Sequence, residues 1–99
     1  MPTMVHKKAF VYMLTNDRGN VLYVGSTENL RERIRFHKGR LIPGFTKKYN
    51  VTRLVYFEEL TCLEEALLRE NYLKGKTRAK KNKLIEIKNP SFRDLTLDL

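Results

Sequence analysis

The chain has 99 residues, 41% of them hydrophobic and 31% charged, which suits one folded domain with a modest core and excludes a disordered tail. Its 20 Lys and Arg residues outnumber its 11 Asp and Glu residues, and the net charge of +9 favours a polyanionic partner: DNA, RNA or an acidic membrane surface. Cys62 is the only cysteine, which excludes an internal disulfide and a cysteine-based zinc site and indicates a reducing, cytoplasmic setting.

Membrane insertion is not expected. Residues 1–8 lack the apolar core of a signal peptide, and no apolar run approaches the roughly 20 residues that a membrane-spanning helix needs. We expect a single domain over residues 1–99, with its core over about 9–95. Because the positive charge is clustered, a nucleic-acid partner is favoured over a merely solvated basic surface.

The first two predicted elements form a β-hairpin. Residues 9–15 are rich in strand formers and apolar on both faces, which predicts a central strand covered on both sides. Turn-forming residues at 16–20 separate them from a second strand at 21–24.

The register of this hairpin decides where two tyrosines lie. With Asp17 and Arg18 at the tip of the turn, Tyr12 is expected directly opposite Tyr23, on the same face. A bulge at Gly19 would change this register.

The rest of the chain predicts three helices and a third strand. Thr27 is expected to cap the first helix, which follows a tight strand-to-helix turn at Gly25 and ends near Lys38. The other elements are a strand at 51–60, a helix opened by a capping box at 61–64 that runs to about Lys74, and a helix at 78–88 capped by Thr77. The order β-β-α-β-α-α predicts an α/β layer of the α+β type. A doubly wound parallel sheet is excluded because no crossover helix separates the first two strands.

The first helix directs cations toward the core. Leu30 and Ile34 define its apolar stripe, and Arg33 and His37 fall on the same stripe at helical spacing. Cations rarely face a core unless they meet a negative partner there. Such a partner is therefore expected in front of this helix, either from the protein or from a ligand.

The second helix carries a matching anomaly. Leu63, Ala66, Leu67 and Leu73 define its predicted buried stripe, and Glu70 falls near the middle of it. A buried carboxylate is normally paired or bound to a cation. Two interpretations stay open: an ion pair with Lys74 or Arg33, and a role as metal ligand.

Taken singly, these residues have ordinary structural explanations. The tyrosines suit packing, a lone histidine is more often structural, and Asn89 before Pro90 suits a helix stop. Taken together, the two tyrosines, Arg33, His37 and Glu70 hold what phosphodiester hydrolysis needs, and we expect them to converge on one side of the sheet. A carboxylate holds a divalent metal, an arginine binds the scissile phosphate, and a phenol takes a proton from water.

The chain resembles the GIY-YIG nuclease superfamily, and within it the small bacterial and archaeal proteins that contain only this domain. The resemblance is carried by Val11-Tyr12-Met13, Tyr23-Val24-Gly25-Ser26-Thr27, Asn29-Leu30, Arg33, His37, Arg69-Glu70, Lys74 and Asn89-Pro90. The first motif departs from the family's Gly-Ile-Tyr in its flanks. Lys76 stands where this subgroup tends to carry a tryptophan, which affects expected packing and DNA docking there.

The resemblance implies a fold and a mechanism. The fold would be a three-stranded antiparallel sheet flanked by helices. Glu70 would be the sole protein ligand to Mg²⁺ or Mn²⁺, and Tyr12 the general base. The remaining roles would be positioning of water or phosphate by Tyr23, binding of the scissile phosphate by Arg33, assistance by His37 and support of the site by Asn89.

Two basic groups would flank this site and hold the phosphate backbone. The candidates for nucleic-acid binding are Arg31, Arg35, Lys47, Lys48, Lys74, Lys76, Arg78, Lys80 and Lys81. A charge run is usually only a solvated face, but several phosphate contacts would make affinity fall steeply with salt.

The expected function is a metal-dependent endonuclease that cleaves DNA, with structure-specific cleavage in repair or processing as its role. Larger relatives use an attached domain for target choice, so specificity here would be weak or supplied by a protein partner, and the chain would be a monomer or weak dimer. The alternative is a basic DNA- or RNA-binding module without catalysis. A protein-interaction domain would leave the cation-bearing apolar stripes unexplained.

Overall fold

The computed structural model describes residues 7–39, 44 and 48–99. They form an antiparallel sheet of three strands, β1 (Ala9–Thr15), β2 (Leu22–Thr27) and β3 (Arg53–Leu60), in the spatial order β2-β1-β3. The helices are α1 (Leu30–Lys38), α3 (Leu63–Lys74) and α4 (Arg78–Lys88), followed by the short 3-10 helix η1 (Thr96–Asp98). The predicted order β-β-α-β-α-α and the α+β class are confirmed.

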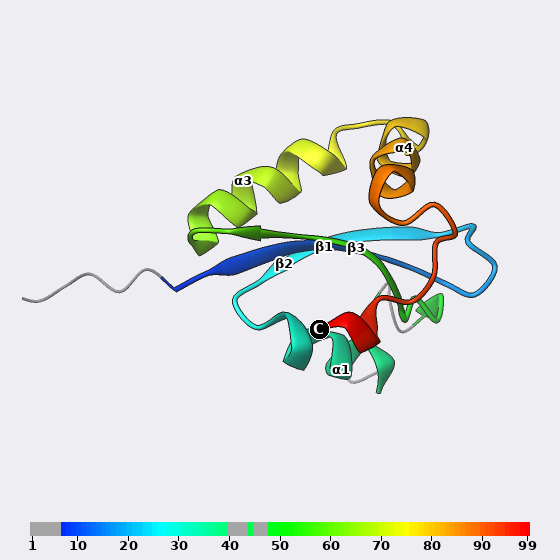
Figure 1. The fold of residues 1–99 in the computed structure, drawn as a ribbon, viewed down its shortest axis with the longest axis horizontal. Coiled ribbons are helices and arrows are strands. Elements are labelled where there is room, and N and C mark those ends of the chain that lie inside the picture. The colour runs from blue at the N-terminus through cyan, green and yellow to red at the C-terminus, as the bar shows by residue number, and fades with distance from the viewer. Residues whose placement is uncertain (1–6, 40–43, 45–47) are drawn as a thin grey trace, which may run out of the picture.

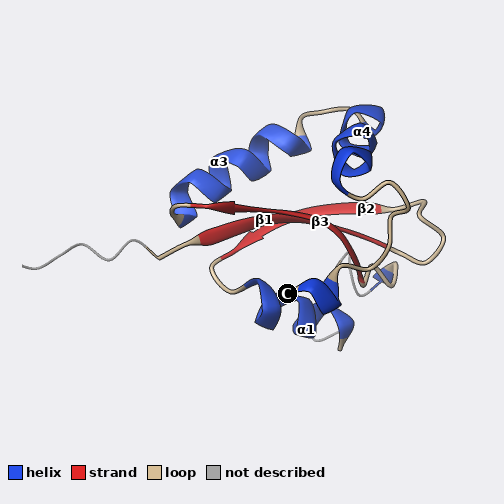
Figure 2. Ribbon diagram, viewed as in Figure 1, coloured by secondary structure: helices blue, strands red, loops and turns tan. Residues whose placement is uncertain are grey.

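The sheet is the middle layer of the molecule. Helices α3 and α4 cover one face, and α1 and η1 lie against the other (Figure 1; Figure 2). Alternate side chains of β1 point into the two layers, as a strand requires. Val11 and Met13 pack with α3 and α4, whereas Tyr12 and Leu14 pack with α1. The prediction of a central strand buried on both faces is confirmed. No helix among the described residues is long and apolar enough to cross a membrane.

The predicted hairpin register is wrong by two residues. Tyr12 pairs with Gly25, and Tyr23 pairs with Leu14. The turn is the reason: Gly19 has φ +69°, which a glycine adopts easily, and its N–H donates to the carbonyl of Asn16 at 3.0 Å. Because the shift is an even number, both tyrosines stay on one face, as predicted.

Gly25 is not the strand-to-helix turn that the sequence suggested. It lies inside β2, which continues to Thr27. A Cβ at this position would lie 2.6 Å from the hydroxyl oxygen of Tyr12 and 2.9 Å from the ring of Tyr23. The glycine therefore leaves room for the Tyr12 ring to extend from the central strand across the edge strand.

The helix starts differ partly from the prediction. The N-cap of α1 is Asn29 rather than Thr27, and its side chain accepts a hydrogen bond from a first-turn N–H. The capping box at 61–64 does not form, because Cys62 is the N-cap and makes no side-chain cap bond. Thr77 caps α4 as predicted, accepting from the N–H of Lys80 at 3.2 Å.

Candidate active site

The α1 face of the sheet brings two tyrosines and a histidine together. The ring centroids of Tyr12 and Tyr23 are 6.2 Å apart, and that of His37 lies 5.7 and 5.4 Å from them. The Tyr12 hydroxyl and His37 Nε2 share a hydrogen bond of 3.0 Å. His37 is 2% exposed, and its Nδ1 has no hydrogen-bond partner among the described residues. The predicted grouping of these three residues is therefore present.

Burial sets the protonation states of this pair. Burial raises the pKa of Tyr12, the neighbouring Tyr23 raises it further, and Arg33 opposes the shift. Burial, together with the charge of Arg33, lowers the pKa of His37 to about 4. At pH 7 the phenol and the imidazole are both neutral, so the tautomer of His37 decides which of them donates the shared proton.

Arg33 lies one helical turn before His37 on α1 and is half-buried. Its charge acts on Tyr12 and on His37, which places it within electrostatic reach of both. None of the ion pairs between described residues involves Arg33. A half-buried guanidinium without an acidic partner suits the binding of an external anion.

Glu70 approaches from the other layer. It lies on α3, where its carboxylate accepts a hydrogen bond from Ser26 and forms an ion pair of 2.5 Å with Lys74. Ser26 pairs with Val11, whose side chain packs on the α3 face. The ion pair with Lys74 that we considered is present, and a pair with Arg33 is not found.

The expected convergence on one side of the sheet is wrong. Tyr12, Tyr23 and His37 lie on the α1 face, whereas Glu70 lies over the α3 face. The two groups meet at β2. Because β2 is an edge strand, only this one strand lies between them. The link is electrostatic, since the charge of Glu70 contributes to raising the pKa of Tyr12. The candidate site is therefore the β2 edge, approached from both faces.

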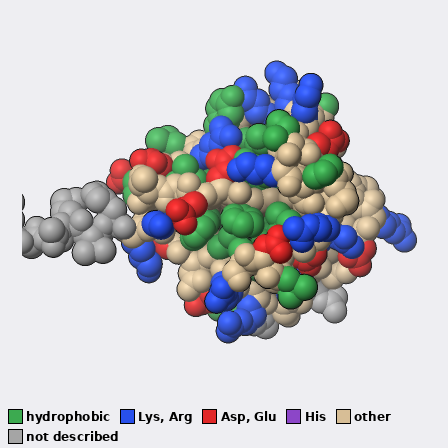
Figure 3. Space-filling model, viewed as in Figure 1, with side chains coloured by type: hydrophobic (Ala, Val, Ile, Leu, Met, Phe, Trp, Pro, Cys, Tyr) green, Lys and Arg blue, Asp and Glu red, His purple; other side chains and the backbone are tan. Residues whose placement is uncertain are grey.

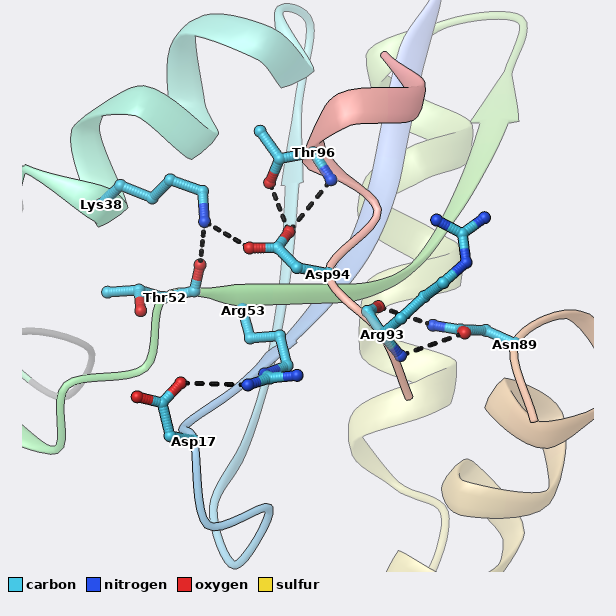
Figure 4. Close-up of polar contacts among 8 residues, drawn as sticks. All are labelled: Asp17, Lys38, Thr52, Arg53, Asn89, Arg93, Asp94 and Thr96. Carbon is cyan, nitrogen blue, oxygen red and sulfur yellow. Dashed lines mark hydrogen bonds and ion pairs between the residues drawn. The ribbon is translucent and has the colours of Figure 1, made fainter. Parts of the chain in front are cut away.

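Asn89 lies elsewhere. It is buried, and its side-chain amide donates to the carbonyl of Val55 at 3.0 Å. The amide also donates to the Arg93 carbonyl at 2.9 Å, and the side-chain oxygen accepts from the Arg93 N–H (Figure 4). Val55 belongs to β3, at the other edge of the sheet. The described contacts of Asn89 therefore support β3 and the C-terminal tail and do not reach the tyrosines.

Sequence reasoning missed Ser26. Because Gly25 was interpreted as a turn, the predicted strand ended before Ser26. Had the strand continued, its alternation would have placed the Ser26 side chain on the opposite face from its neighbours and toward Glu70. The signal was present in the spacing, but it depended on extending β2 by three residues beyond Val24.

The fit of a divalent metal depends on Glu70 alone. The described residues contain no group of three His, Cys, Asp or Glu side chains that would hold a metal ion. Mg²⁺ keeps several waters and is often bound by one carboxylate together with substrate phosphates. Glu70 fits that pattern as a single ligand, provided that Lys74 moves away from Oε2.

The candidate phosphate-binding residues fall into several places. Arg31 and Arg35 are exposed on α1, Lys48 is exposed before β3, and Lys47 lies outside the described residues. The others follow the end of α3 and the start of α4: Lys74, Lys76, Arg78, Lys80 and Lys81. Arg78 also has a structural contact, since it donates to the carbonyl of Gly19 at 2.8 Å.

Known proteins share this domain. The model of the GIY-YIG catalytic domain matches residues 8–83. A UPF0213 protein of Clostridium perfringens is 38% identical over 80 residues, which cover 81% of this chain and 85% of that protein. UvrABC system protein C of Protochlamydia amoebophila is 38% identical over 82 residues, which cover 77% of this chain and 13% of that longer protein. The solution NMR structure of the UPF0213 protein BH0048 from Bacillus halodurans has a TM-score of 0.56 at 28% identity, and the match covers 90% of this chain and 94% of that one.

Paired tyrosines, an arginine and a glutamate at one edge of a small α+β sheet define a nuclease-like catalytic domain. The chain belongs to the GIY-YIG family. Membership implies nuclease activity in general, and with it a nucleic-acid substrate.

Proposed function

We propose that the chain is a metal-dependent endonuclease that hydrolyses phosphodiester bonds in DNA, with structure-specific cleavage during repair or processing in the cytoplasm as its role. The main support is the meeting of Tyr12, His37 and Glu70 at the β2 edge, beside an arginine without an acidic partner. Target choice would be weak or would come from a protein partner.

In this proposal Arg33 binds the scissile phosphate through its planar guanidinium. Tyr12 lies next to it, and its 3.0 Å hydrogen bond to His37 Nε2 gives its proton a place to go. As Tyr12 takes a proton from the attacking water, it passes its own to Nε2, so a buried phenolate does not have to persist. The Tyr23 hydroxyl orients the water or the phosphate.

Glu70 would hold Mg²⁺ or Mn²⁺. Such an ion supplies charge that stabilises the phosphate transition state and the leaving oxygen. Ser26 holds one carboxylate oxygen of Glu70 and so fixes its direction. Lys74 holds the other oxygen and would have to leave it for Glu70 to hold a metal ion.

The test is cleavage of supercoiled, branched and single-stranded DNA with Mg²⁺ or Mn²⁺. Wild-type protein is compared with Glu70→Ala and Tyr12→Phe, and with Glu64→Ala as the matched control, because Glu64 is an exposed glutamate of the same helix. We expect metal-dependent nicking that is lost in the first two variants and retained in the control. Equal traces of nicking in every variant would indicate contamination and overturn the proposal.

A binding module without catalysis is the second candidate. Both carboxylate oxygens of Glu70 already accept hydrogen bonds from the protein. This favours a structural role for Glu70 over the binding of a metal ion. Salt-sensitive binding of DNA or RNA, with no cleavage of any substrate, would support this function instead.

A further inference from the structure

We propose that bound nucleic acid leaves the β2-edge site in one direction only, toward the turn between β1 and β2, and that an unpaired nucleotide enters the hollow beside that turn. The inference rests on the proposed function in one respect, since it takes nucleic acid as the substrate. It adds the direction of the substrate and a second binding site outside the catalytic residues.

The two ends of the sheet are defined by the strand register. Thr15, Leu22 and Arg53 pair at one end, which we call the turn end, and Phe10 and Thr27 pair at the opposite end.

Helices α1 and α3 both run from the opposite end toward the turn end (Figure 1). Helix α1 starts just after β2, and its last residue, Lys38, donates to the Thr52 carbonyl at 3.0 Å. Helix α3 starts just after β3, and the helix that follows it begins at Arg78, which bonds to Gly19 in the turn.

Charge is divided between these two ends. Acidic side chains gather at the opposite end: Glu28, Glu32, Glu59, Glu64 and Glu65. Basic side chains gather at the turn end: Arg18, Lys48, Lys74, Lys76, Arg78, Lys80 and Lys81. In the space-filling view, acidic side chains lie over the start of α3 and a group of Lys and Arg side chains lies over α4 (Figure 3). The opposite end also carries Lys7, Lys8 and Arg31, which offset much of its acidic charge, whereas the turn end is strongly basic and attracts phosphates.

Helix dipoles account for only part of this division. They favour acids in the first turns of α1 and α3 and cations in their last turns. The first turn of helix α4 departs from this pattern, because it holds no acid and carries Arg78, Lys80 and Lys81, although its last turn holds Lys88. Cations at a helix N-terminus are unfavourable for the isolated fold, which indicates an external polyanion at this place. Asp17, an acid of the turn itself, is neutralised by Arg53 at 3.3 Å.

The hollow beside the turn has the chemistry of a nucleotide subsite. It measures about 540 Å³ and is lined by the cations Arg18 and Lys48, by Tyr49 and Val21, and by Asn16, Asn20, Asn50 and Asp17, the last of which is paired with Arg53. Tyr49 is 43% exposed, and Lys48 Nζ lies 5.4 Å from the centroid of its ring. An aromatic ring beside cations binds unpaired bases by stacking while the cations hold the phosphates. A base paired in a duplex is not free to enter it.

A second hollow on the turn is less suited to phosphate. It measures about 360 Å³ and is lined in part by Arg53 and Arg78. Arg53 is paired with Asp17, and Arg78 donates to the backbone of the turn (Figure 4 shows the first of these contacts). These guanidinium groups hold the turn in place, whereas Arg18 and Lys48 have no ion pair among the described residues.

The test measures binding without cleavage. The full chain carrying Glu70→Ala is titrated, in the presence of a chelator, with a fluorescent blunt duplex and with the same duplex bearing a single-stranded extension. Arg18→Gln with Lys48→Gln should lower the slope of log affinity against log salt for the extended DNA by roughly 1.4, because two single-strand phosphate contacts are lost. Tyr49→Ala should weaken binding of the extended DNA by at least about fivefold and leave the blunt duplex unchanged.

Lys7→Gln is the matched control, since it removes one positive charge from an exposed residue near the opposite end. It should leave both affinities unchanged. Equal losses for the two DNAs, a loss in Lys7→Gln as large as in the variant with Arg18→Gln and Lys48→Gln, or no loss in any variant would overturn the inference. Because no cleavage is measured, these results are independent of whether the wild-type chain cuts DNA.

Discussion

The two edges of the sheet carry similar types of residue, but these residues make different contacts at each edge. At the β3 edge, buried Tyr56 donates to Glu58, and Glu58 receives two bonds of 2.9 Å from Arg69. This tyrosine, carboxylate and guanidinium satisfy one another completely. Arg69 holds the pKa of Glu58 below its usual range even though burial acts in the other direction.

At the β2 edge the same groups do not close on one another. Tyr12 bonds to His37, Glu70 is held by Ser26 and Lys74, and Arg33 has no acidic partner among the described ion pairs. The comparison teaches that residue types alone do not define a site. The β2 edge differs from the β3 edge because its guanidinium, within the described part of the fold, has no carboxylate partner and so can bind a ligand.

The largest effect is expected from removing the carboxylate at each edge. Glu70→Ala should lower cleavage at least about thousandfold, because on the proposed function Glu70 would hold the metal ion that supplies several kcal/mol of transition-state stabilisation. Glu58→Ala should leave cleavage unchanged and lower the free energy of unfolding by about 2–3 kcal/mol, because Arg69 and Tyr56 lose their charged partner. Nuclease assays and urea unfolding of both variants measure this. A loss of cleavage in Glu58→Ala at full stability would contradict the comparison.

The two buried tyrosines give the next contrast. Tyr12→Phe should reduce cleavage by about hundredfold or more, which is typical of a lost general base, and should change stability by less than Tyr56→Phe. Tyr56→Phe removes a bond to a carboxylate and should cost about 1.5 kcal/mol of stability with cleavage unchanged. If both variants cleave DNA at the wild-type rate, Tyr12 has no catalytic role.

The pH dependence of the free energy of unfolding tests the lowered pKa of the buried His37. In the unfolded chain His37 takes up a proton below its ordinary pKa of 6.5, whereas in the folded protein its pKa is lowered to about 4. The unfolded state therefore binds more protons between these values, and stability falls as the pH falls. From pH 7 to pH 5 the loss from this group should be about 2 kcal/mol, and His37→Gln should remove it. Urea titrations of both proteins at both pH values test this, and equal pH dependence in the two would refute it.

The smallest effect concerns the glycine beneath Tyr12. Gly25→Ala places a Cβ 2.6 Å from the Tyr12 hydroxyl, and such overpacking should cost about 1–2 kcal/mol of stability and lower cleavage. Gly75→Ala is the control, because its Cβ would lie no closer than 3.5 Å to its neighbours and its φ is −77°. It should be neutral or stabilise the protein by up to about 1 kcal/mol. Thermal unfolding of the two variants should separate them, and equal melting temperatures would not agree with the close contact at Gly25.

The sequence alone predicted the elements whose signals are local. The apolar run of β1, the cap at Thr77 and the stop before Pro90 each depend on neighbouring residues, and the structure has them where they were expected. Glu70 was also identified, because a carboxylate on an apolar stripe is anomalous whatever surrounds it. Its ion pair with Lys74 follows from helical spacing alone.

Features that depend on distant segments were not predicted. Leu63 and Leu67 were expected inside but are 36% and 46% exposed, because α3 turns Ala66 and Leu73 to the sheet. Apolar periodicity defines a stripe but not the rotation at which a helix docks. The hairpin register depended on one positive φ at Gly19. The split of the site between two faces followed from the packing of α1 and α3 on opposite faces of the sheet.

The C-terminal tail has a consequence for how copies of this molecule meet. An edge strand with free carbonyls invites another strand to add to it, which is a route to aggregation. The tail occupies two of these groups on β3, with the Leu95 N–H on the Leu54 carbonyl at 2.8 Å and the Asn89 amide on the Val55 carbonyl at 3.0 Å. These contacts hinder edge-to-edge pairing at this part of β3 and leave β2, on which Ser26 holds Glu70, as the edge without such cover from the tail.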